Sequence, residues 1–339
     1  MYHIRLRGTH REIGGKLGRA LLTSGKDFYS ITALDEFQEN FGSESQKILF
    51  SIFPEVREEI EGAAEAMQFP AARLASWLMT VGCCYDFRGC TAFAFRKGDK
   101  ICYGRNSDLP PALKKVSCSA LYQPADGGNA FLLNTSAVIN GEEGINRYGL
   151  ACAMTFVAPD TGRIQPGLNS MFIVRYLLEK AADVAEALHL LKSLPVASSC
   201  NILLADASGA LAACECSCER LLINNNNEFV YITNEFLSDT MRPYASLCNS
   251  AFYSKERTAT CRYAFGVPFE NTENAVPFAE DLLSGKYGFM CNYPKEGNFD
   301  TVWSSIFCPG EGVILRAEGN PSRTHFKEDK RSEILFGKQ

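Results

Sequence analysis

The apolar pattern of the chain changes its period at Cys90. In residues 1–82, apolar side chains recur at helical spacing and predict a mainly helical segment after a short first strand. From Cys90 onward, residues 91–95 and 101–106 flank a glycine-containing turn and predict a β-hairpin. The chain is therefore expected to fold with helices first and with strands that begin at Cys90.

The rest of the chain continues in blocks of strands and pairs of helices. Helices are expected at 11–22, 26–41, 43–52, 54–67, 71–82, 169–181, 183–193, 244–265 and 273–284, and further strands at 117–123, 129–136, 149–157, 200–206, 210–217, 220–223, 228–233, 301–307 and 312–317. In the helix at 54–67, Glu58, Glu59 and Glu61 are expected to form a solvated face. Strand blocks joined mostly by hairpins favour an α+β fold with largely antiparallel sheets. No repeat or linker divides the chain, so a single domain over residues 1–339 is predicted.

A glycine directly precedes the cysteine that opens the hairpin. Gly89 has no Cβ, so its carbonyl can adopt a strained conformation and be approached closely by the Cys90 thiol. Attack on that carbonyl would be an N-to-S acyl shift, and hydrolysis would then cut the chain and free the Cys90 α-amino group. That amine titrates near pH ~7.7–8 and can serve as the general base of the thiol without a histidine. The alternative is that Cys90 is one buried strand cysteine among many.

Composition excludes several classes of protein. Apolar residues make up 46% of the chain and charged residues 22%, as in an ordinary globular protein. The net charge of −5 gives no basis for binding nucleic acid or an anionic membrane surface. No apolar run reaches the ~18–20 residues of a membrane helix, and the N-terminus lacks the apolar core of a signal peptide. We therefore expect a cytoplasmic protein with neither nucleic-acid nor membrane partners.

The chain has 14 cysteines and 4 histidines. In a long chain without a signal peptide, free buried thiols are expected rather than a disulfide framework. Cys214, Cys216 and Cys218 have period-2 spacing, which puts the three thiols on one face of a strand, and no nearby histidine completes a set of metal ligands. No metal and no cofactor is therefore expected. No histidine has a setting that favours catalysis, which makes an amine base for Cys90 more attractive.

Several other residues could serve a cysteine nucleophile. The hairpin return would bring Arg105 and Asp108 back toward Cys90, where an arginine lowers the pKa of a thiol and an aspartate can hold an ammonium group. Asn201 begins an apolar strand, and its amide could donate to an oxyanion without adding charge. Asn146 could do the same or simply make a turn. Each of these also has a purely structural explanation, and an exposed Arg–Asp pair at a strand end is worth little.

Taken together, these motifs resemble the N-terminal-nucleophile (Ntn) hydrolase superfamily. The motifs are Gly89-Cys90-Thr91, Gly104-Arg105-Asn106-x-Asp108, Gly144-x-Asn146-x-x-Gly149-Leu150 and Ser199-Cys200-Asn201. Within the superfamily, the chain is similar to the choloylglycine hydrolase and penicillin acyltransferase families. It resembles most of all the acyl-CoA:6-aminopenicillanic acid acyltransferase-like proteins, which process themselves. The resemblance covers nearly the whole chain and includes Thr233-Asn234.

The resemblance implies a fold and a processing event. The implied fold is a four-layer αββα sandwich with two mainly antiparallel sheets. Cleavage between Gly89 and Cys90 would leave a mostly helical leader, residues 1–89, and a catalytic chain, residues 90–339. The sequence departs from the family pattern at Arg88, where an acidic residue is common, and at Glu235, where histidine often follows Thr-Asn. Both departures bear on the substrate more than on the reaction.

The resemblance also implies a role for each site residue. Cys90 would be the nucleophile, Arg105 and Asp108 would orient it and its amine, Asn201 would supply the oxyanion hole, and Asn146 would contribute there. A further site arginine is expected downstream, with Arg257 as our choice and Arg262 as the alternative.

The expected function is that of a self-processed amidohydrolase or acyltransferase acting on linear C–N amides. Penicillin-like, bile-acid-like and N-acyl-amino-acid-like substrates all fit, so the expected partner is a small acyl amide, and homo-oligomerisation is left open. One alternative is a catalytically silent protein of the same fold that binds acylated or peptide ligands. Another is a Cys–His thiol hydrolase of unrelated fold.

Overall fold

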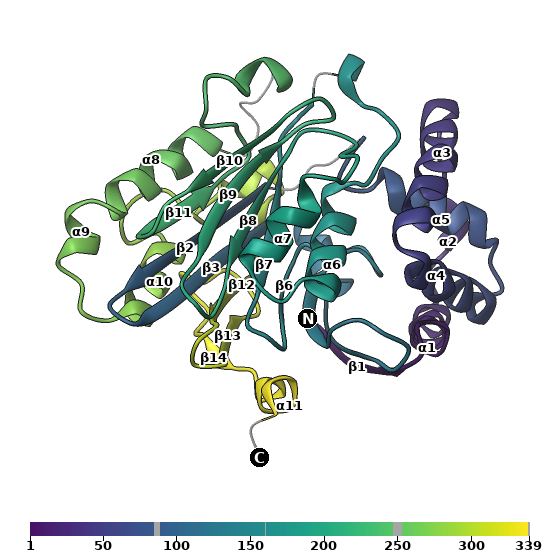
Figure 1. Cartoon of the computed structure of the whole chain (residues 1–339), viewed down its shortest axis with the longest axis horizontal. Coiled ribbons are helices and arrows are strands. Elements are labelled where there is room, and N and C mark those ends of the chain that lie inside the picture. The colour runs from purple at the N-terminus through teal and green to yellow at the C-terminus, as the bar shows by residue number, and fades with distance from the viewer. Residues whose placement is uncertain (85–88, 160, 247–252, 338–339) are drawn as a thin grey trace.

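Two β-sheets lie face to face at the centre of the structure, a computed structural model that describes residues 1–84, 89–159, 161–246 and 253–337 (Figure 1). Within these ranges the larger sheet has eight strands, antiparallel except for the parallel pair β1–β4. In order across the sheet they are β1 (Tyr2–Gly8), β4 (Cys118–Pro124), β5 (Phe131–Thr135), β6 (Glu143–Asn146), β7 (Ala151–Phe156), β8 (Cys200–Ala205), β9 (Leu211–Cys216) and β10 (Leu221–Asn225).

The smaller sheet, counted over the same described residues, has six antiparallel strands. In order they are β11 (Phe229–Ile232), β2 (Gly89–Lys97), β3 (Lys100–Leu109), β12 (Asp300–Cys308), β13 (Val313–Ala317) and β14 (Lys327–Glu328). β2 and β3 form the predicted hairpin, in which Cys90 pairs with Ser107. Because side chains alternate along a strand, Cys90 shares its face of β2 with Ala92 and Ala94. These alanines are buried between the two sheets, so the thiol also points into that space.

Helices cover the outer faces of both sheets. α6 (Ser170–Lys180) and α7 (Val184–Leu191) pack on the larger sheet, and α8 (Ser254–Ala264), α9 (Val267–Glu270) and α10 (Ala275–Leu283) on the smaller one. The predicted α+β class and four-layer αββα sandwich are therefore confirmed. The helix expected at 244–265 is shorter, since only α8 is helical there and residues 247–252 lie outside the described residues.

The remaining helices are short or peripheral. α11 (Arg331–Phe336) follows the last strand, and 3₁₀ helices are η1 (Pro111–Lys115), η2 (Thr161–Arg163), η3 (Arg242–Tyr244) and η4 (Lys295–Gly297). In the described part of the chain, no helix combines the length and the apolar character that crossing a membrane requires.

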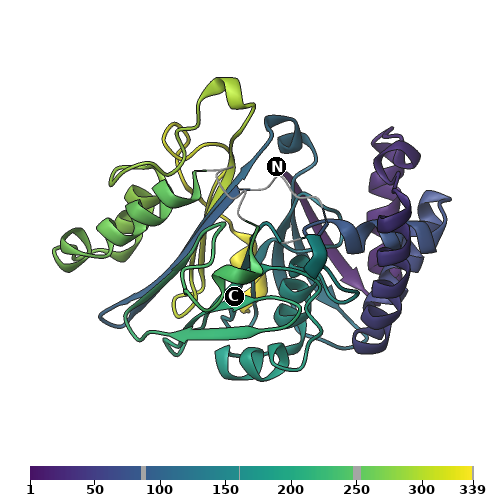
Figure 2. The ribbon, with the colours of Figure 1, turned by 90° about the horizontal axis from the view of Figure 1, so that it is seen from above.

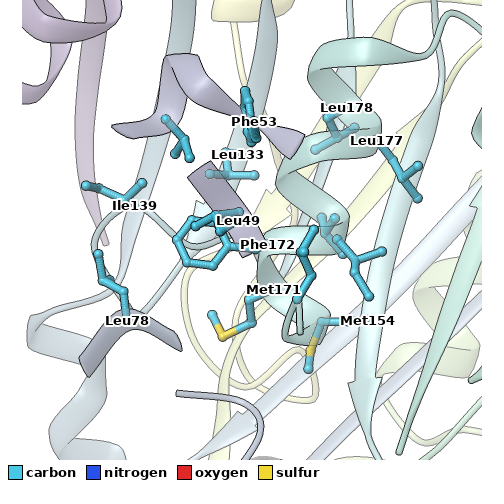
Figure 3. Packing of buried hydrophobic residues seen from close by; sticks show 14 of the residues in the cluster. Leu49, Phe53, Leu78, Leu133, Ile139, Met154, Met171, Phe172, Leu177 and Leu178 are labelled. Carbon is cyan, nitrogen blue, oxygen red and sulfur yellow. The ribbon is translucent and has the colours of Figure 1, made fainter. Parts of the chain in front are cut away.

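The N-terminal segment is built into the sandwich. Its helices are α1 (His10–Thr23), α2 (Phe28–Ile31), α3 (Glu36–Ile52), α4 (Pro54–Met67) and α5 (Ala71–Thr80), and they lie on the side of the molecule opposite α8–α10 (Figure 2). Leu49 of α3, Leu78 of α5 and Phe53, which lies between α3 and α4, belong to one buried cluster with Phe172 of α6 (Figure 3). Each such side chain contributes about 1.5–3 kcal/mol when it is fully buried. A shared core therefore holds the N-terminal helices to the sheets.

A buried ionic network joins the same helices to α6. Glu59 of α4 accepts from Nη2 of Arg175 at 2.7 Å, and Arg175 also pairs with Glu179 at 3.0 Å. The ring of His10 contacts Glu179 through Nε2 at 2.8 Å and Asp126 through Nδ1 at 2.7 Å. Burial lowers the pKa of His10, but the hydrogen bond and charge of Glu179 outweigh it, so the pKa lies above its ordinary value. The expectation that Glu59 lies on a solvated face of α4 is wrong. Glu59 is fully buried, and its pairing with Arg175 compensates its charge there.

The close crossing of α1 and α4 gives one prediction about stability. A Cβ at Gly14 would lie 1.9 Å from the main-chain oxygen of Glu59, so Gly14→Ala must push the helices apart. We expect the free energy of unfolding, measured by urea denaturation, to fall by about 1–3 kcal/mol. Gly15→Ala is the matched control, because the nearest atom to its Cβ is the flexible end of Arg19 at 3.4 Å. Equal destabilisation by the two variants would contradict the packing explanation.

Candidate active site

Cys90 lies near the start of β2 and is fully buried between the two sheets. Its Sγ is 2.9 Å from Nη2 of Arg105 on β3. The two meet because the hairpin register places Ala92 opposite Arg105, so the arginine shares the inward face with the thiol. A guanidinium this close favours the thiolate form of a cysteine. The hairpin thus builds the contact that a thiol nucleophile needs.

Buried acceptors hold Arg105 in place. Nη2 is 3.3 Å from the carbonyl oxygen of Met154 and 3.6 Å from Oε2 of Glu142, and Nη1 donates to Oγ of Ser107. Burial lowers the pKa of Arg105, but attraction to Cys90 and to neighbouring buried carboxylates outweighs it, and the pKa lies above its ordinary value. The guanidinium is therefore a fixed positive charge beside the thiol.

Asp108, near the end of β3, faces away from the space between the sheets. Its Oδ1 accepts from Oγ1 of Thr301 at 2.6 Å, and its Oδ2 accepts from the hydroxyl of Tyr293 at 2.7 Å. Burial raises the pKa of Asp108, and the charge of Arg257 and these two hydrogen bonds lower it less, so the pKa stays above its ordinary value. Asp108 is the register partner of Gly89. A buried carboxyl group therefore lies beside the predicted cleavage point.

The main chain of Cys90 is held by Asn234 and Arg257. Its nitrogen donates to Oδ1 of Asn234 at 2.8 Å, and its carbonyl oxygen accepts from Nη1 of Arg257. Nη2 of Arg257 also donates to Oδ1 of Asn234 at 2.7 Å, and Nδ2 of Asn234 donates to the carbonyl oxygen of Phe156 at 2.7 Å. Asn234 follows β11, and the pairing of β11 with β2 brings it to Cys90. Buried groups therefore fix the orientation of the nitrogen that was predicted to act as the base.

Close packing explains the glycine before Cys90. A Cβ at Gly89 would lie 2.9 Å from Cε1 of Phe299 and 3.2 Å from Cβ of Asp108. The structure thus gives a packing reason for this glycine, and the conformational reason that the sequence suggested stays a prediction.

Comparison with protein families bears on this geometry. The model of the acyl-coenzyme A:6-aminopenicillanic acid acyl-transferase family matches residues 95–323, more than half of the chain. The chain belongs to this family. The residues matched to the acyl-transferase family include Arg105, Asp108, Asn234 and Arg257, whereas Cys90 lies just before the match begins. The assignment of the thiol to the site therefore rests on the contacts described above.

Several solved structures are similar to this acyl-transferase family member. Penicillin V acylase from Agrobacterium tumefaciens is 17% identical, with a TM-score of 0.45 over 68% of this chain and 83% of that chain. A mutant conjugated bile acid hydrolase from Clostridium perfringens is 15% identical, with a TM-score of 0.48 over 74% and 95%. An N-acylethanolamine-hydrolyzing acid amidase orthologue from Caenorhabditis elegans is 17% identical, with a TM-score of 0.45 over 65% and 93%. No curated protein matches the chain.

The structure does not bring the amide of Asn201 to Cys90. Asn201 is buried on β8, and its Nδ2 donates to the carbonyl oxygens of Thr233 at 2.9 Å and Glu235 at 3.1 Å. It also donates to Oγ1 of Thr155 at 3.1 Å. The oxyanion role expected from the resemblance would require this amide to leave its present acceptors.

Asn146 lies on the face of β6 that is turned toward α6. Its Nδ2 donates to the carbonyl oxygens of Leu178 at 3.0 Å and Ala181 at 2.7 Å, at the end of that helix. Its neighbour Ile145 packs between the sheets, and side chains alternate along a strand. Asn146 is thus separated from Cys90 by the sheet itself. Its observed contacts are those of a residue that anchors the end of α6.

Of the two candidate arginines, the structure places Arg257 at Cys90. Arg262 is exposed and hydrogen-bonds Tyr231 instead. Asn234 and Tyr293 are site residues that the sequence reasoning did not select. The motif Thr233-Asn234 was the available signal for the first, whereas nothing in the pattern around Tyr293 indicated a site. Arg88, where the sequence departs from the family pattern, lies outside the described residues.

The remaining cysteines and histidines have other surroundings. Cys214 and Cys216 lie on β9 and are buried against the helices, whereas Cys218 lies beyond the end of that strand. The three thiols therefore do not share one strand face as expected. In the part of the chain that the structure describes, the cysteines are free thiols and no three metal-ligating side chains gather at one point. Both ring nitrogens of the buried His10 contact carboxylates, which leaves neither for a thiol.

Proposed function

We propose that the protein is a self-processed hydrolase or acyltransferase that uses the Cys90 thiol to open linear amide bonds. One observation carries the proposal. The thiol lies 2.9 Å from a fixed guanidinium, while the nitrogen of the same residue is held 2.8 Å from Oδ1 of Asn234. A nucleophile and its base can thus belong to a single residue once that nitrogen is a free amine. Membership of an acyl-transferase family supports the same class of reaction.

Processing would proceed by an acyl shift at the Gly89–Cys90 bond. Sγ of Cys90 attacks the Gly89 carbonyl carbon, and the C–N bond of the peptide breaks. The nitrogen stays bonded to Cα of Cys90 and takes up the proton that the thiol has lost. Water then hydrolyses the thioester, which gives a Gly89 carboxylate, a free thiol and a free amine. Residues 1–84 share a core and a parallel strand pair with the rest of the chain, so the leader would stay bound after cleavage.

In turnover, the Cys90 amine would take the proton of the thiol as Sγ attacks the substrate carbonyl carbon. Arg105 stabilises the thiolate, and Asn234 and Arg257 hold the main chain so that amine and sulfur keep their relative positions. The amine then gives the proton to the leaving nitrogen, and water or a second amine takes the acyl group. Penicillin-like, bile-acid-like and N-acyl-amino-acid-like amides are the substrate classes to screen.

Mass spectrometry of the purified wild-type protein tests the proposal. We expect two chains that separate at Gly89 and Cys90 and whose masses add up to 37.4 kDa plus one water. The same sample should release amines from a panel of N-acyl amides. An intact chain with full amidase activity would refute processing as the trigger. An intact chain that binds acyl amides without turnover, with Cys90 unreactive toward iodoacetamide, would favour the silent binding protein instead.

The pH dependence of activity should respond to Tyr293. Its hydroxyl lowers the pKa of Asp108, so Tyr293→Phe should raise that pKa further. If ionised Asp108 supports the Cys90 amine, activity is lost as the pH falls through this pKa. The acid limb of the kcat/KM profile should therefore move to higher pH by about one unit or less, the size of one hydrogen bond. Tyr287→Phe, which removes a hydroxyl near Asp281, should leave the limb in place; an unmoved limb in Tyr293→Phe would contradict a role for Asp108.

A further inference from the structure

In the proposed processing, Gly89 is the first acyl group that the thiol of Cys90 attacks. In turnover the acyl group of a substrate forms a thioester with the same sulfur, after the Gly89 carboxylate has left its place. Sγ of Cys90 is held 2.9 Å from Nη2 of Arg105, and strand pairing fixes Gly89 opposite Asp108. The atoms that surround the α-carbon of Gly89 therefore also surround the α-carbon of a bound acyl group.

Little space is left at this α-carbon on the side where an L-amino acid carries its Cβ. A Cβ built on Gly89 would lie 2.9 Å from Cε1 and 3.0 Å from Cζ of Phe299, and 3.2 Å from Cβ of Asp108. Non-bonded carbon atoms pack best at about 3.5–4.0 Å. The ring of Phe299 and the first side-chain carbon of Asp108 therefore leave room for a hydrogen atom but not for a methyl group.

Neighbouring groups hold both of these side chains in place. The ring of Phe299 packs edge-on against Tyr293 with centroids 5.0 Å apart, and Tyr293 packs edge-on against Phe289 at 5.3 Å. The hydroxyl of Tyr293 donates to Oδ2 of Asp108 at 2.7 Å, and Oγ1 of Thr301 donates to Oδ1 at 2.6 Å. Moving Phe299 aside would disturb this packing, and overpacking of a well-filled site is unfavourable. The Phe299 ring is thus a wall of the acyl position.

We propose that Phe299 selects acyl groups whose α-carbon carries no substituent. The substrates would be amides of the type R–CH₂–CO–NH–R′, in which the α-carbon carries two hydrogen atoms as in Gly89 itself. An acyl group with an α-substituent in the L configuration would meet Phe299 before its carbonyl carbon reached Sγ of Cys90. Phe299 supplies no group to the reaction, so its role is specificity. The selection rests on the proposed function, because it acts on the acyl group that Cys90 receives.

A matched pair of p-nitroanilides tests the proposal in turnover. N-acetyl-glycyl-p-nitroanilide and N-acetyl-L-alanyl-p-nitroanilide differ only in the α-methyl group, and each releases p-nitroaniline on hydrolysis. We expect kcat/KM of the wild-type protein to be about 10–200-fold lower for the L-alanyl compound. Phe299→Leu removes Cε1 and Cζ and should reduce this ratio by about tenfold or more. Phe289→Leu is the matched control and should leave the ratio unchanged, because Phe289 is not among the atoms nearest to the Gly89 position.

Cleavage of the chain itself gives a second arm. Gly89→Ala places the methyl group on the acyl group that the thiol attacks first, and intact mass should show slow or incomplete cleavage. Combining Gly89→Ala with Phe299→Leu should restore cleavage. The comparison of the two anilides in the wild-type protein needs no variant, so it decides even if these variants fail to fold. If an enzyme that is active on other amides turns over neither anilide, the Gly89→Ala variants decide.

The outcomes separate this selection from the proposed function. An uncut wild-type chain that releases no amine from any amide refutes the proposed function, and the selection with it. A wild-type protein that is cut and active but hydrolyses both anilides equally overturns the selection alone. An unchanged ratio in folded Phe299→Leu, or cleavage of Gly89→Ala at the wild-type rate, also overturns it.

Discussion

Cys90→Ala is expected to yield one uncut chain of 37.4 kDa and to abolish amide turnover. The variant removes the atom that lies 2.9 Å from Arg105 Nη2, and with it both the acyl shift and the nucleophile. Loss of a nucleophile in a comparable covalent hydrolase costs on the order of 10⁶-fold in kcat. Intact mass and the release of amine from an N-acyl amide panel are the two measurements. Because alanine is small and apolar, the buried site should still fold.

Cys102→Ala is the matched control for this variant. Cys102 is also fully buried and lies on β3 next to β2, but it packs toward α8–α10 instead of toward the larger sheet. We expect normal processing and activity in that variant, with only a small loss of stability. A Cys90→Ala protein that is still cut at Gly89, or that still releases amine at the wild-type rate, would remove the thiol from the mechanism.

Sequence alone was sufficient where the structure depends on local pairing. The Cys90–Arg105 contact follows from one hairpin, whose turn fixes the register over the few residues between the strands. The α+β class was equally readable, because apolar periodicity distinguishes helices from strands, whereas the four layers were implied by the family resemblance. Both inferences needed no knowledge of which distant strands pair.

Contacts that depend on pairing between segments far apart in the chain could not be predicted from the sequence. Asn234 contacts Cys90 only because β11 pairs with β2, across 144 residues of chain. Asn146 lies on the face of β6 that is turned away from Cys90, and that depends on the phase of one short strand relative to the sheet. Glu59 was expected in water and is buried against Arg175, a partner from another helix that no local pattern reveals. What the sequence missed are contacts between segments far apart in the chain.

The asparagine that matters for chemistry is therefore expected to be Asn234. Asn234→Ala removes the acceptor that holds the Cys90 nitrogen at 2.8 Å and leaves Arg257 without one of its buried partners. A base displaced by about 1 Å can lose on the order of 10²-fold in rate. We expect a fall of about that size in kcat, with a smaller change in KM, measured in steady-state kinetics on the fully processed fraction.

Asn201→Ala distinguishes the structural role that the observed contacts of Asn201 indicate from the oxyanion role that the family resemblance implies. The amide of Asn201 ties Thr233 and Glu235 together and does not reach Cys90, so its loss should lower the free energy of unfolding by about 1–3 kcal/mol and reduce kcat less than Asn234→Ala does. A direct oxyanion donor would instead cost about 10²–10³-fold in kcat. If Asn201→Ala shows that loss with unchanged stability and Asn234→Ala does not, the amide moves to the substrate during turnover, and the site works as the family resemblance implied. If Asn234→Ala instead shows the larger loss of kcat, the nucleophile is held by Asn234, the residue that the pairing of β11 with β2 brings to it.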